Sequence, residues 1–152
     1  MTSPSARLRE LALTLPTVAA PAGSYVPARR SGALVFTAGQ LPFVDGALAA
    51  TGKIGGEVTP EQGKDLARTC ALNALAAVDA LVGLDAVSGV VKVVGFVASA
   101  PGFTGQPGVI NGASDLLADV FGEAGRHARS AVGVAELPLG APVEVELVVE
   151  LA

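Results

Sequence analysis

The sequence predicts an α+β fold, in which a mixed sheet carries two long helices on one face and a short helix precedes them. Two segments support this prediction. Residues 87–99 are the most apolar run of the chain and contain six valines, which is typical of a strand inside a sheet with both faces covered. Residues 60–82 are rich in alanine and place apolar residues at helical spacing, which indicates a long helix packed on that sheet.

The expected elements follow one another without a change in composition that would separate two domains, so we expect one domain over residues 1–152. Residues 1–20 form an N-terminal helical extension of it. In chain order, the elements are a helix at 5–15, strands at 25–30 and 33–38, a helix at 60–82, a strand at 87–99, a helix at 109–121, and strands that begin at 128 and at 143.

The N-terminal helix is predicted from leucines at helical spacing, and Pro16 marks its end. The next two strands are joined by Ser31 and Gly32, which are typical residues of a hairpin turn. Residues 39–58 follow as a Gly-rich loop. Because this loop contains no phosphate-binding glycine motif, we expect no nucleotide site.

The first long helix has the clearest boundaries in the sequence. Thr59 is a suitable N-cap, Pro60 suits the first helical position, and Gln62 can complete a capping box. Gly83 can end the helix in a left-handed conformation. Cys70 lies inside the helix, so we interpret it as a buried small residue rather than a nucleophile. The face expected to pack on the sheet consists of Leu66, Cys70, Ala74, Ala77 and Leu81.

The C-terminal part continues with a Gly- and Pro-rich loop at residues 101–108 and the second long helix, which glycines end at 122–125. Two strands complete the chain. In the last one, residues 143–151, valines and leucines alternate with glutamates, which predicts one apolar and one acidic face. Pairing of these two strands as a hairpin would bring Glu144 close to Arg129.

The composition favours an oligomer and argues against several classes of partner. Hydrophobic residues make up 51% of the chain and the mean hydropathy is +0.56, which indicates apolar surface for a partner subunit to cover. A net charge of -4 without a basic cluster argues against nucleic acid as a partner. The apolar runs are too short to span a membrane, and the charged N-terminus is unlike a signal peptide, so we expect a cytoplasmic protein.

Few side chains in this sequence are suited to catalysis. A single cysteine excludes an internal disulfide, and a single histidine, His127, excludes a histidine-rich metal site. A Ser-His-Asp triad would require His127 as its base, but the chain has no Gly-x-Ser-x-Gly nucleophile motif. Arg129 stands at the head of an apolar strand, where it is either an exposed turn residue or a clamp for a carboxylate.

Three segments of the chain form a specific pattern. The most specific segment is Ala-Arg-Ser-Ala-Val-Gly-Val-Ala-Glu-Leu-Pro at residues 128–138, followed by Val-Glu-Val-Glu at 143–146. The others are Thr-Ala-Gly-Gln-Leu-Pro at 37–42 and the strand at 91–97. Together these segments resemble the Rid family, the reactive-intermediate deaminases that are also described as endoribonuclease L-PSP-like proteins. The resemblance extends from Tyr25 to the C-terminus.

This resemblance implies a chorismate-mutase-like fold, assembled as a homotrimer with a cleft at each subunit interface. The family reaction is the hydrolysis of an imine or enamine to a 2-keto acid and ammonia, and it needs neither a cofactor nor a metal ion. Such a reaction suits a chain with few reactive side chains. An imine carbon is already electrophilic, so orientation and a placed water supply much of the rate.

By the same resemblance, Arg129 holds the carboxylate of the substrate and Glu144 positions or activates water. The residues implied to bind the substrate or to line the cleft are Tyr25, Gly39, Asn111 and Ala131. Ala131 stands where the family commonly has a cysteine, but the backbone of that residue is the part that the family site uses. We expect His127 to be a neighbour of the site at most.

Two other functions remain compatible with the sequence. One is a non-catalytic module that binds a small carboxylate, such as a 2-keto acid, in the same cleft. The other is endoribonuclease activity, which the acidic net charge and the lack of a basic groove disfavour. The N-terminal extension and the loop at 101–108 lie outside the compact family pattern, and the loop could reshape the mouth of the cleft.

Overall fold

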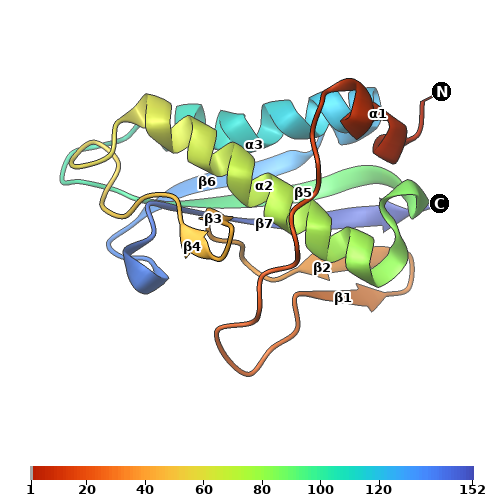
Figure 1. Cartoon of the computed structure of the whole chain (residues 1–152). Helices are drawn as coiled ribbons and strands as arrows, with labels where there is room; N and C mark the ends of the chain where they lie inside the picture. The colour runs from red at the N-terminus through yellow and green to blue at the C-terminus, as the bar shows by residue number, and fades with distance from the viewer. Residues whose placement is uncertain (1) are drawn as a thin grey trace.

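The computed structural model describes residues 2–152 and shows a five-stranded mixed sheet with both long helices on one face (Figure 1). The strand order is β1-β2-β7-β5-β6, with β5 and β6 parallel and the other neighbours antiparallel. The predicted α+β fold class is therefore confirmed. The elements of these two layers are β1 (Ala28–Ser31), β2 (Leu34–Thr37), β5 (Val87–Ala98), β6 (Ala128–Val134), β7 (Val143–Leu151), α2 (Pro60–Val82) and α3 (Gln106–Phe121).

Helix α2 begins and ends where its sequence signals predict. The Thr59 hydroxyl accepts a hydrogen bond from the Gln62 backbone N–H at 3.1 Å, and the Gln62 side chain accepts one from the Thr59 N–H at 2.9 Å. Gly83 ends the helix with a φ of +81°. Cys70 is fully buried, as predicted. The prediction for Leu81 is wrong, because the last turn of α2 is exposed to solvent and leaves this side chain 46% exposed.

Two glycines allow close packing of the helices and the sheet around α3. A Cβ atom at Gly112 of α3 would overlap the backbone carbonyl of Lys64 in α2. A Cβ atom at Gly95 of β5 would overlap the side chain of Ile110, so α3 also lies close to the sheet. Although α2 and α3 are largely buried, no helix within residues 2–152 is long and apolar enough to cross a membrane.

The replacement Gly112→Ala is expected to destabilise the protein by about 1–3 kcal/mol, because α2 and α3 must move apart to accept the methyl group. Chemical denaturation followed by circular dichroism measures the free energy of unfolding. Gly108→Ala on the same helix is the matched control, since a Cβ atom there has no neighbour within 4 Å. This control should be slightly more stable than wild type. Equal unfolding free energies for the two variants would show that α2 and α3 do not require glycine at their contact.

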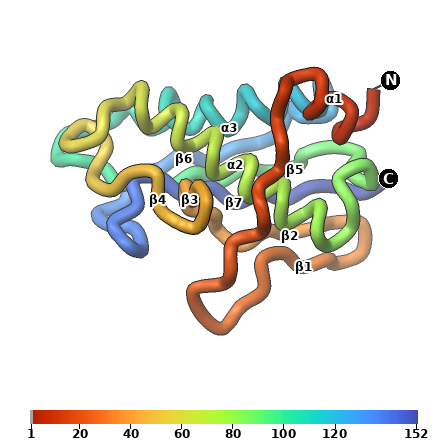
Figure 2. Tube along the Cα trace, in the orientation of Figure 1, coloured from red at the N-terminus to blue at the C-terminus, as the bar shows by residue number. Residues whose placement is uncertain are grey.

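The N-terminal extension folds as helix α1 (Pro4–Glu10), followed by an extended segment that leads to β1 (Figure 2). This helix is shorter than the predicted one at 5–15, because Ala12 adopts a left-handed conformation with a φ of +56° shortly after it. Residues 16–20 of the extended segment line a cavity of about 480 Å³ together with Asn73 of α2. The extension thus packs on the helix layer of the fold.

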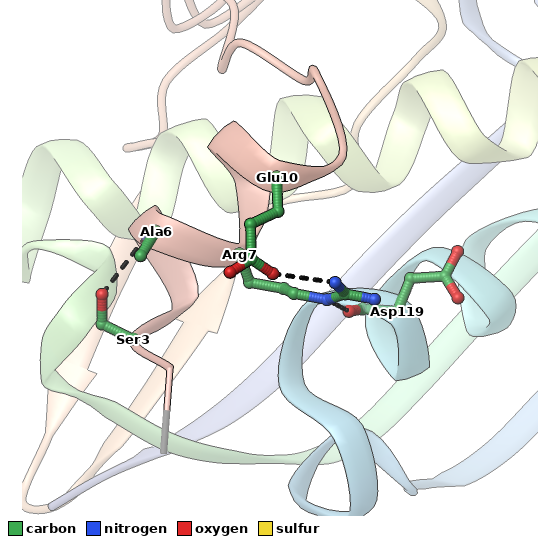
Figure 3. Close-up of polar contacts among 5 residues, drawn as sticks. All are labelled: Ser3, Ala6, Arg7, Glu10 and Asp119. Atoms are coloured by element: carbon green, nitrogen blue, oxygen red, sulfur yellow. Dashed lines mark hydrogen bonds and ion pairs between the residues drawn. The ribbon is translucent and has the colours of Figure 1, made fainter.

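Figure 3 shows polar contacts of α1, one of which attaches it to α3. The Nε atom of Arg7 donates to the backbone carbonyl of Asp119 at 2.8 Å, and its Nη1 atom pairs with Glu10 at 2.9 Å. Ser3 caps the helix, because its hydroxyl accepts from the Ala6 N–H at 3.2 Å. The Arg7–Glu10 pair is exposed and contributes little. The bond to the Asp119 backbone joins α1 to α3, while Ser5 donates to the Asp85 carboxylate and Leu8 is buried in the core.

The structure differs from the sequence prediction at three further places. Strand β1 is shorter than predicted and starts at Ala28. The loop at 39–58 contains an unpredicted hairpin of β3 (Phe43–Val44) and β4 (Ala47–Leu48), whose turn residues Asp45 and Gly46 both have positive φ values, as a tight hairpin turn requires. Helix α3 begins at Gln106 rather than at 109, because Pro107 is favourable in a first helical turn.

The predicted hairpin between the last two strands is wrong. Within residues 2–152, β6 pairs with β5 alone, whereas β7 lies between β2 and β5. The reason lies in β5, which is apolar on both faces and therefore takes a position with a neighbour on each side. As a result, β5 separates Arg129 in β6 from Glu144 in β7.

Candidate functional site

Arg129 lies in the edge strand β6 and is held by two residues of α3. Its Nη1 atom donates to the side-chain oxygen of Asn111 at 2.7 Å and to the hydroxyl of Ser114 at 3.2 Å. In the sheet, Arg129 is paired with Val93, whose side chain is completely buried under the helices. Paired residues of neighbouring strands point to the same face, so the Arg129 side chain lies on the helix-covered face. The guanidinium is therefore fixed to α3.

The contacts with α3 leave one edge of this guanidinium free. Both contacts use Nη1, and within residues 2–152 neither Nε nor Nη2 of Arg129 donates to another group. Nη2 is the terminal nitrogen on the same side as the Nε–H bond, so these two N–H groups point in parallel from one edge. Two parallel N–H donors match the two oxygens of a carboxylate, and this edge can bind one.

A cavity of about 390 Å³ lies beside Arg129. Its lining contains two guanidinium groups and one imidazole but no carboxylate, so its charge favours a small anion. Glu123 pairs with Arg126 at 3.5 Å but does not belong to the lining. The lining residues are Ser114, Ala118, Gly125, Arg126, His127 and Arg129.

Glu144 lies at the start of β7, on the sheet face opposite to Arg129. Its neighbours Val143 and Val145 are completely buried against the helices, so strand alternation turns the Glu144 side chain to the uncovered face. A Cβ atom at Gly39 would overlap the Glu144 carboxylate. The absence of a side chain at Gly39 therefore allows this carboxylate to lie directly against the backbone that leaves β2.

Burial raises the pKa of the Glu144 carboxyl above its ordinary value, and repulsion by Glu146 raises it further. The folded protein therefore keeps this proton at pH values at which the unfolded chain has released it. Stability is lost as the pH rises from the ordinary glutamate range through the raised pKa. The replacement Glu144→Gln should thus increase the free energy of unfolding at neutral pH, but not below the ordinary pKa of glutamate.

Thermal unfolding of Glu144→Gln and wild type measures this change in stability, at neutral pH and at a pH below the ordinary pKa of glutamate. Glu150→Gln is the matched control, because Glu150 lies on the same face of β7 but is exposed. It should leave the unfolding temperature close to that of wild type at both pH values. If Glu144→Gln raises the unfolding temperature by the same amount in acid and at neutral pH, the charge of Glu144 is not the cause of the stabilisation.

The structure places the residues that the sequence suggested for the site in three groups. The groups are Arg129 with Asn111 and Ala131, Gly39 with Glu144, and Tyr25 alone. Tyr25 precedes β1, at the sheet edge opposite to β6, where its side chain is 49% exposed and its hydroxyl accepts from the Ala22 N–H at 3.0 Å. One chain therefore does not bring all three groups into a single pocket.

Ser114 is the residue that sequence analysis missed. It contacts both Arg129 and the ring of His127, whose Nε2 atom lies 2.9 Å from the Ser114 hydroxyl. The available signal was its spacing from Asn111, because residues three positions apart share one face of a helix. That spacing became informative only once α3 was known to lie against β6.

Within residues 2–152, neither Cys70 nor the potential metal ligands form a second site. Burial raises the pKa of the Cys70 thiol well above its ordinary value, and the nearby charge of Glu144 adds to this effect. Cys70 also contacts the Val143 carbonyl at 3.7 Å, so it is a buried thiol and not a nucleophile. In the described part of the chain, no three His, Cys, Asp or Glu side chains are grouped so that they could hold a metal ion.

Comparisons with known proteins find relatives along nearly the whole chain. The family model described as "YjgF/chorismate mutase-like, putative endoribonuclease" matches residues 5–151. Protein TCP17 of Trypanosoma cruzi is 50% identical over 149 residues, which cover 97% of this chain and 93% of TCP17.

Two crystal structures show the same architecture. A putative endoribonuclease from Shewanella oneidensis MR-1 superposes with a TM-score of 0.94 at 34% identity, covering 99% of this chain and 100% of that one. TdcF of E. coli, crystallised with bound serine, superposes with a TM-score of 0.67 at 28% identity, covering 91% and 96% of the two chains. The predicted chorismate-mutase-like fold is confirmed by these comparisons.

Proposed function

The chain belongs to the YjgF/chorismate-mutase-like family, and from this premise we propose that it is a cytoplasmic, homotrimeric deaminase that hydrolyses 2-imino acids to 2-keto acids and ammonia. The observation that carries the proposal is the free Nε–Nη2 edge of Arg129, which lies beside a cavity whose charge suits an anion. The serine bound to TdcF supports it, because serine is a small molecule with a carboxylate.

Hydrolysis of a 2-imino acid adds water to the C=N bond and then expels ammonia, so the water oxygen becomes the keto oxygen. Arg129 holds the carboxylate and thereby fixes the adjacent imine carbon. Glu144 takes a proton from the attacking water and passes it to the imine nitrogen. In the second step it carries the hydroxyl proton of the adduct to the departing nitrogen, so both hydrogens of the water end on ammonia. A raised pKa suits a carboxyl group that both accepts and donates a proton near neutral pH. The imine carbon is electrophilic, so this mechanism uses no nucleophilic side chain.

In this proposal, Arg129 and Glu144 of one site come from two subunits. Within one chain they lie on opposite faces of the sheet and on strands that β5 separates, so a site that contains both requires a second copy. The uncovered sheet face offers a surface for this contact, since Phe36 and Val132 there are 45% and 44% exposed. A closed ring of three copies would repeat the same contact three times.

The test is to follow 2-aminoacrylate or 2-iminobutanoate, formed in situ from serine or threonine by a dehydratase, in the presence of the purified protein. We expect faster loss of the imine and equal amounts of keto acid and ammonia. Saturable pyruvate binding without any acceleration would instead identify a binding module. RNA cleavage that is lost in Arg129→Ala would instead identify an endoribonuclease.

A further inference from the structure

Arg129 is the end of a chain of hydrogen bonds whose donors can be assigned from chemistry. The carbonyl of Gly125 can only accept, so His127 carries a hydrogen on Nδ1, which lies 2.6 Å from it. In the neutral ring, Nε2 is then a bare acceptor and takes the hydroxyl hydrogen of Ser114 at 2.9 Å. The Ser114 oxygen has thereby used its only hydrogen, and it accepts from Nη1 of Arg129 at 3.2 Å.

We infer that Ser114 and His127 are positioning residues for Arg129, and that they hold its guanidinium with the Nε–Nη2 edge turned toward the substrate carboxylate. This inference rests on the proposed function, because it concerns the group that holds the carboxylate there. Neither residue touches the substrate in this assignment. Both act through the orientation of Arg129.

The geometry explains why two acceptors are needed. Nη1 has two hydrogens, and the acceptors Asn111 and Ser114 both belong to α3. A single acceptor would leave the guanidinium free to turn about one bond, whereas two acceptors on the same nitrogen define its plane. Once this plane is fixed, the direction of the opposite Nε–Nη2 edge is fixed as well, and less entropy is lost when a carboxylate binds.

His127 has a separate role in this arrangement. A free serine hydroxyl can rotate and point its hydrogen at a neighbouring cation, which would repel the guanidinium. Because His127 takes that hydrogen, Ser114 presents only its lone pairs to Arg129. The Gly125 carbonyl in turn keeps the ring in the required tautomer. The loop before β6 is therefore coupled to the carboxylate site through three consecutive hydrogen bonds.

Ser114 and His127 also have the separation of a serine nucleophile and its base, which is the competing assignment. It differs from ours in one checkable respect. A nucleophilic serine attacks acylating or phosphonylating reagents and becomes labelled, whereas a positioning serine that is bound to both Arg129 and His127 does not react with them. Labelling of Ser114 by a fluorophosphonate probe would overturn our inference.

The first experiment needs no ligand. His127 is the only histidine, so ¹⁵N NMR of the neutral ring reports its two nitrogens without ambiguity. We expect the proton on Nδ1 in wild type, and a mixture of tautomers in Ser114→Ala. The two Nη signals of Arg129 should be separate in wild type and merge in Ser114→Ala, because its rotation is no longer restrained. A wild-type ring protonated on Nε2 would contradict the inference.

The second experiment measures the site itself. Ser114→Ala and His127→Ala should each raise the KM for the imino acid and the Kd for pyruvate by about tenfold, with kcat changed less than about threefold. The double variant should be no worse than either single variant, because the two residues act as one unit. Ser114→Thr keeps a hydroxyl and should restore binding. Arg68→Gln removes a guanidinium on α2 outside the cavity lining and should change both constants less than twofold.

These experiments distinguish a failure of the inference about Ser114 and His127 from a failure of the proposed function. If wild type binds pyruvate but does not hydrolyse the imine, the proposed function fails while pyruvate affinity and the NMR signals still decide the role of Ser114 and His127. If wild type is active but Ser114→Ala has the wild-type KM, pyruvate affinity and tautomer, the inference fails and the proposed function stands.

Discussion

Replacement of Arg129 by alanine is expected to lower kcat/KM for a 2-imino acid by about two to three orders of magnitude. Loss of one partner of a hydrogen-bonded charge pair costs roughly 2–5 kcal/mol, and each 1.4 kcal/mol is a factor of ten. The affinity for pyruvate, a 2-keto acid product, should fall as well, because substrate and product both carry the carboxylate. Steady-state hydrolysis and calorimetric titration with pyruvate measure the two effects.

Arg129→Lys separates the shape of the cation from its charge. Lysine keeps the positive charge but cannot offer two parallel N–H donors to one carboxylate, so most of the loss should persist. Arg68→Ala removes a guanidinium on α2 outside the cavity lining and should cost little. If Arg129→Lys is fully active, Arg129 contributes only a positive potential and the bidentate clamp is wrong.

Glu144→Gln should lower kcat by about two to four orders of magnitude, because the amide cannot take a proton from water. The affinity for pyruvate should change far less, since Glu144 does not hold the carboxylate. In wild type, the acidic limb of the pH profile should lie above the ordinary range of a glutamate, because burial raises the pKa of Glu144. Glu150→Gln, on the same face of β7 but exposed, is the control and should remain active. A pH profile that is unchanged in a fully active Glu144→Gln would remove this residue from the mechanism.

Mixing the two inactive variants tests whether the site is shared between subunits. In a closed trimer of Arg129→Ala and Glu144→Gln chains, each mixed trimer contains one intact site, so co-expression should restore about a quarter of the wild-type activity. Arg129→Ala mixed with Arg129→Lys is the control and should restore nothing. No recovery in mixed trimers would place both residues of a site in one chain, which the sheet topology opposes.

The parts of the fold that depend on neighbouring residues could be predicted from the sequence. Helix α2 was predicted to the residue, because its cap at Thr59 and its stop at Gly83 are local signals. The internal position of β5 followed from its apolar composition. Strand pairing is different, since it is decided by competition between distant segments. The sequence order of β6 and β7 suggested a hairpin, but β5 offered both strands a better partner.

The same limit applies to the candidate site. The role of Arg129 as a carboxylate clamp comes from the family resemblance of its segment and stays a prediction, because its residue type alone also suits an exposed turn. Ser114 could not be predicted, since a serine on a helix has many uses and its role depends on how α3 lies against β6. The separation of Arg129 from Glu144 could not be predicted from the sequence either, because it follows from the strand order and not from the spacing of residues.

A crystal structure with bound pyruvate would show directly whether Arg129 holds the carboxylate. We expect the pyruvate carboxylate on Arg129, with one oxygen on Nε and the other on Nη2 at about 2.7–2.9 Å, while Nη1 keeps its bonds to Asn111 and Ser114. Glu144 of a neighbouring subunit should face the keto carbon. Pyruvate bound elsewhere, with the Nε–Nη2 edge of Arg129 in solvent, would contradict the account.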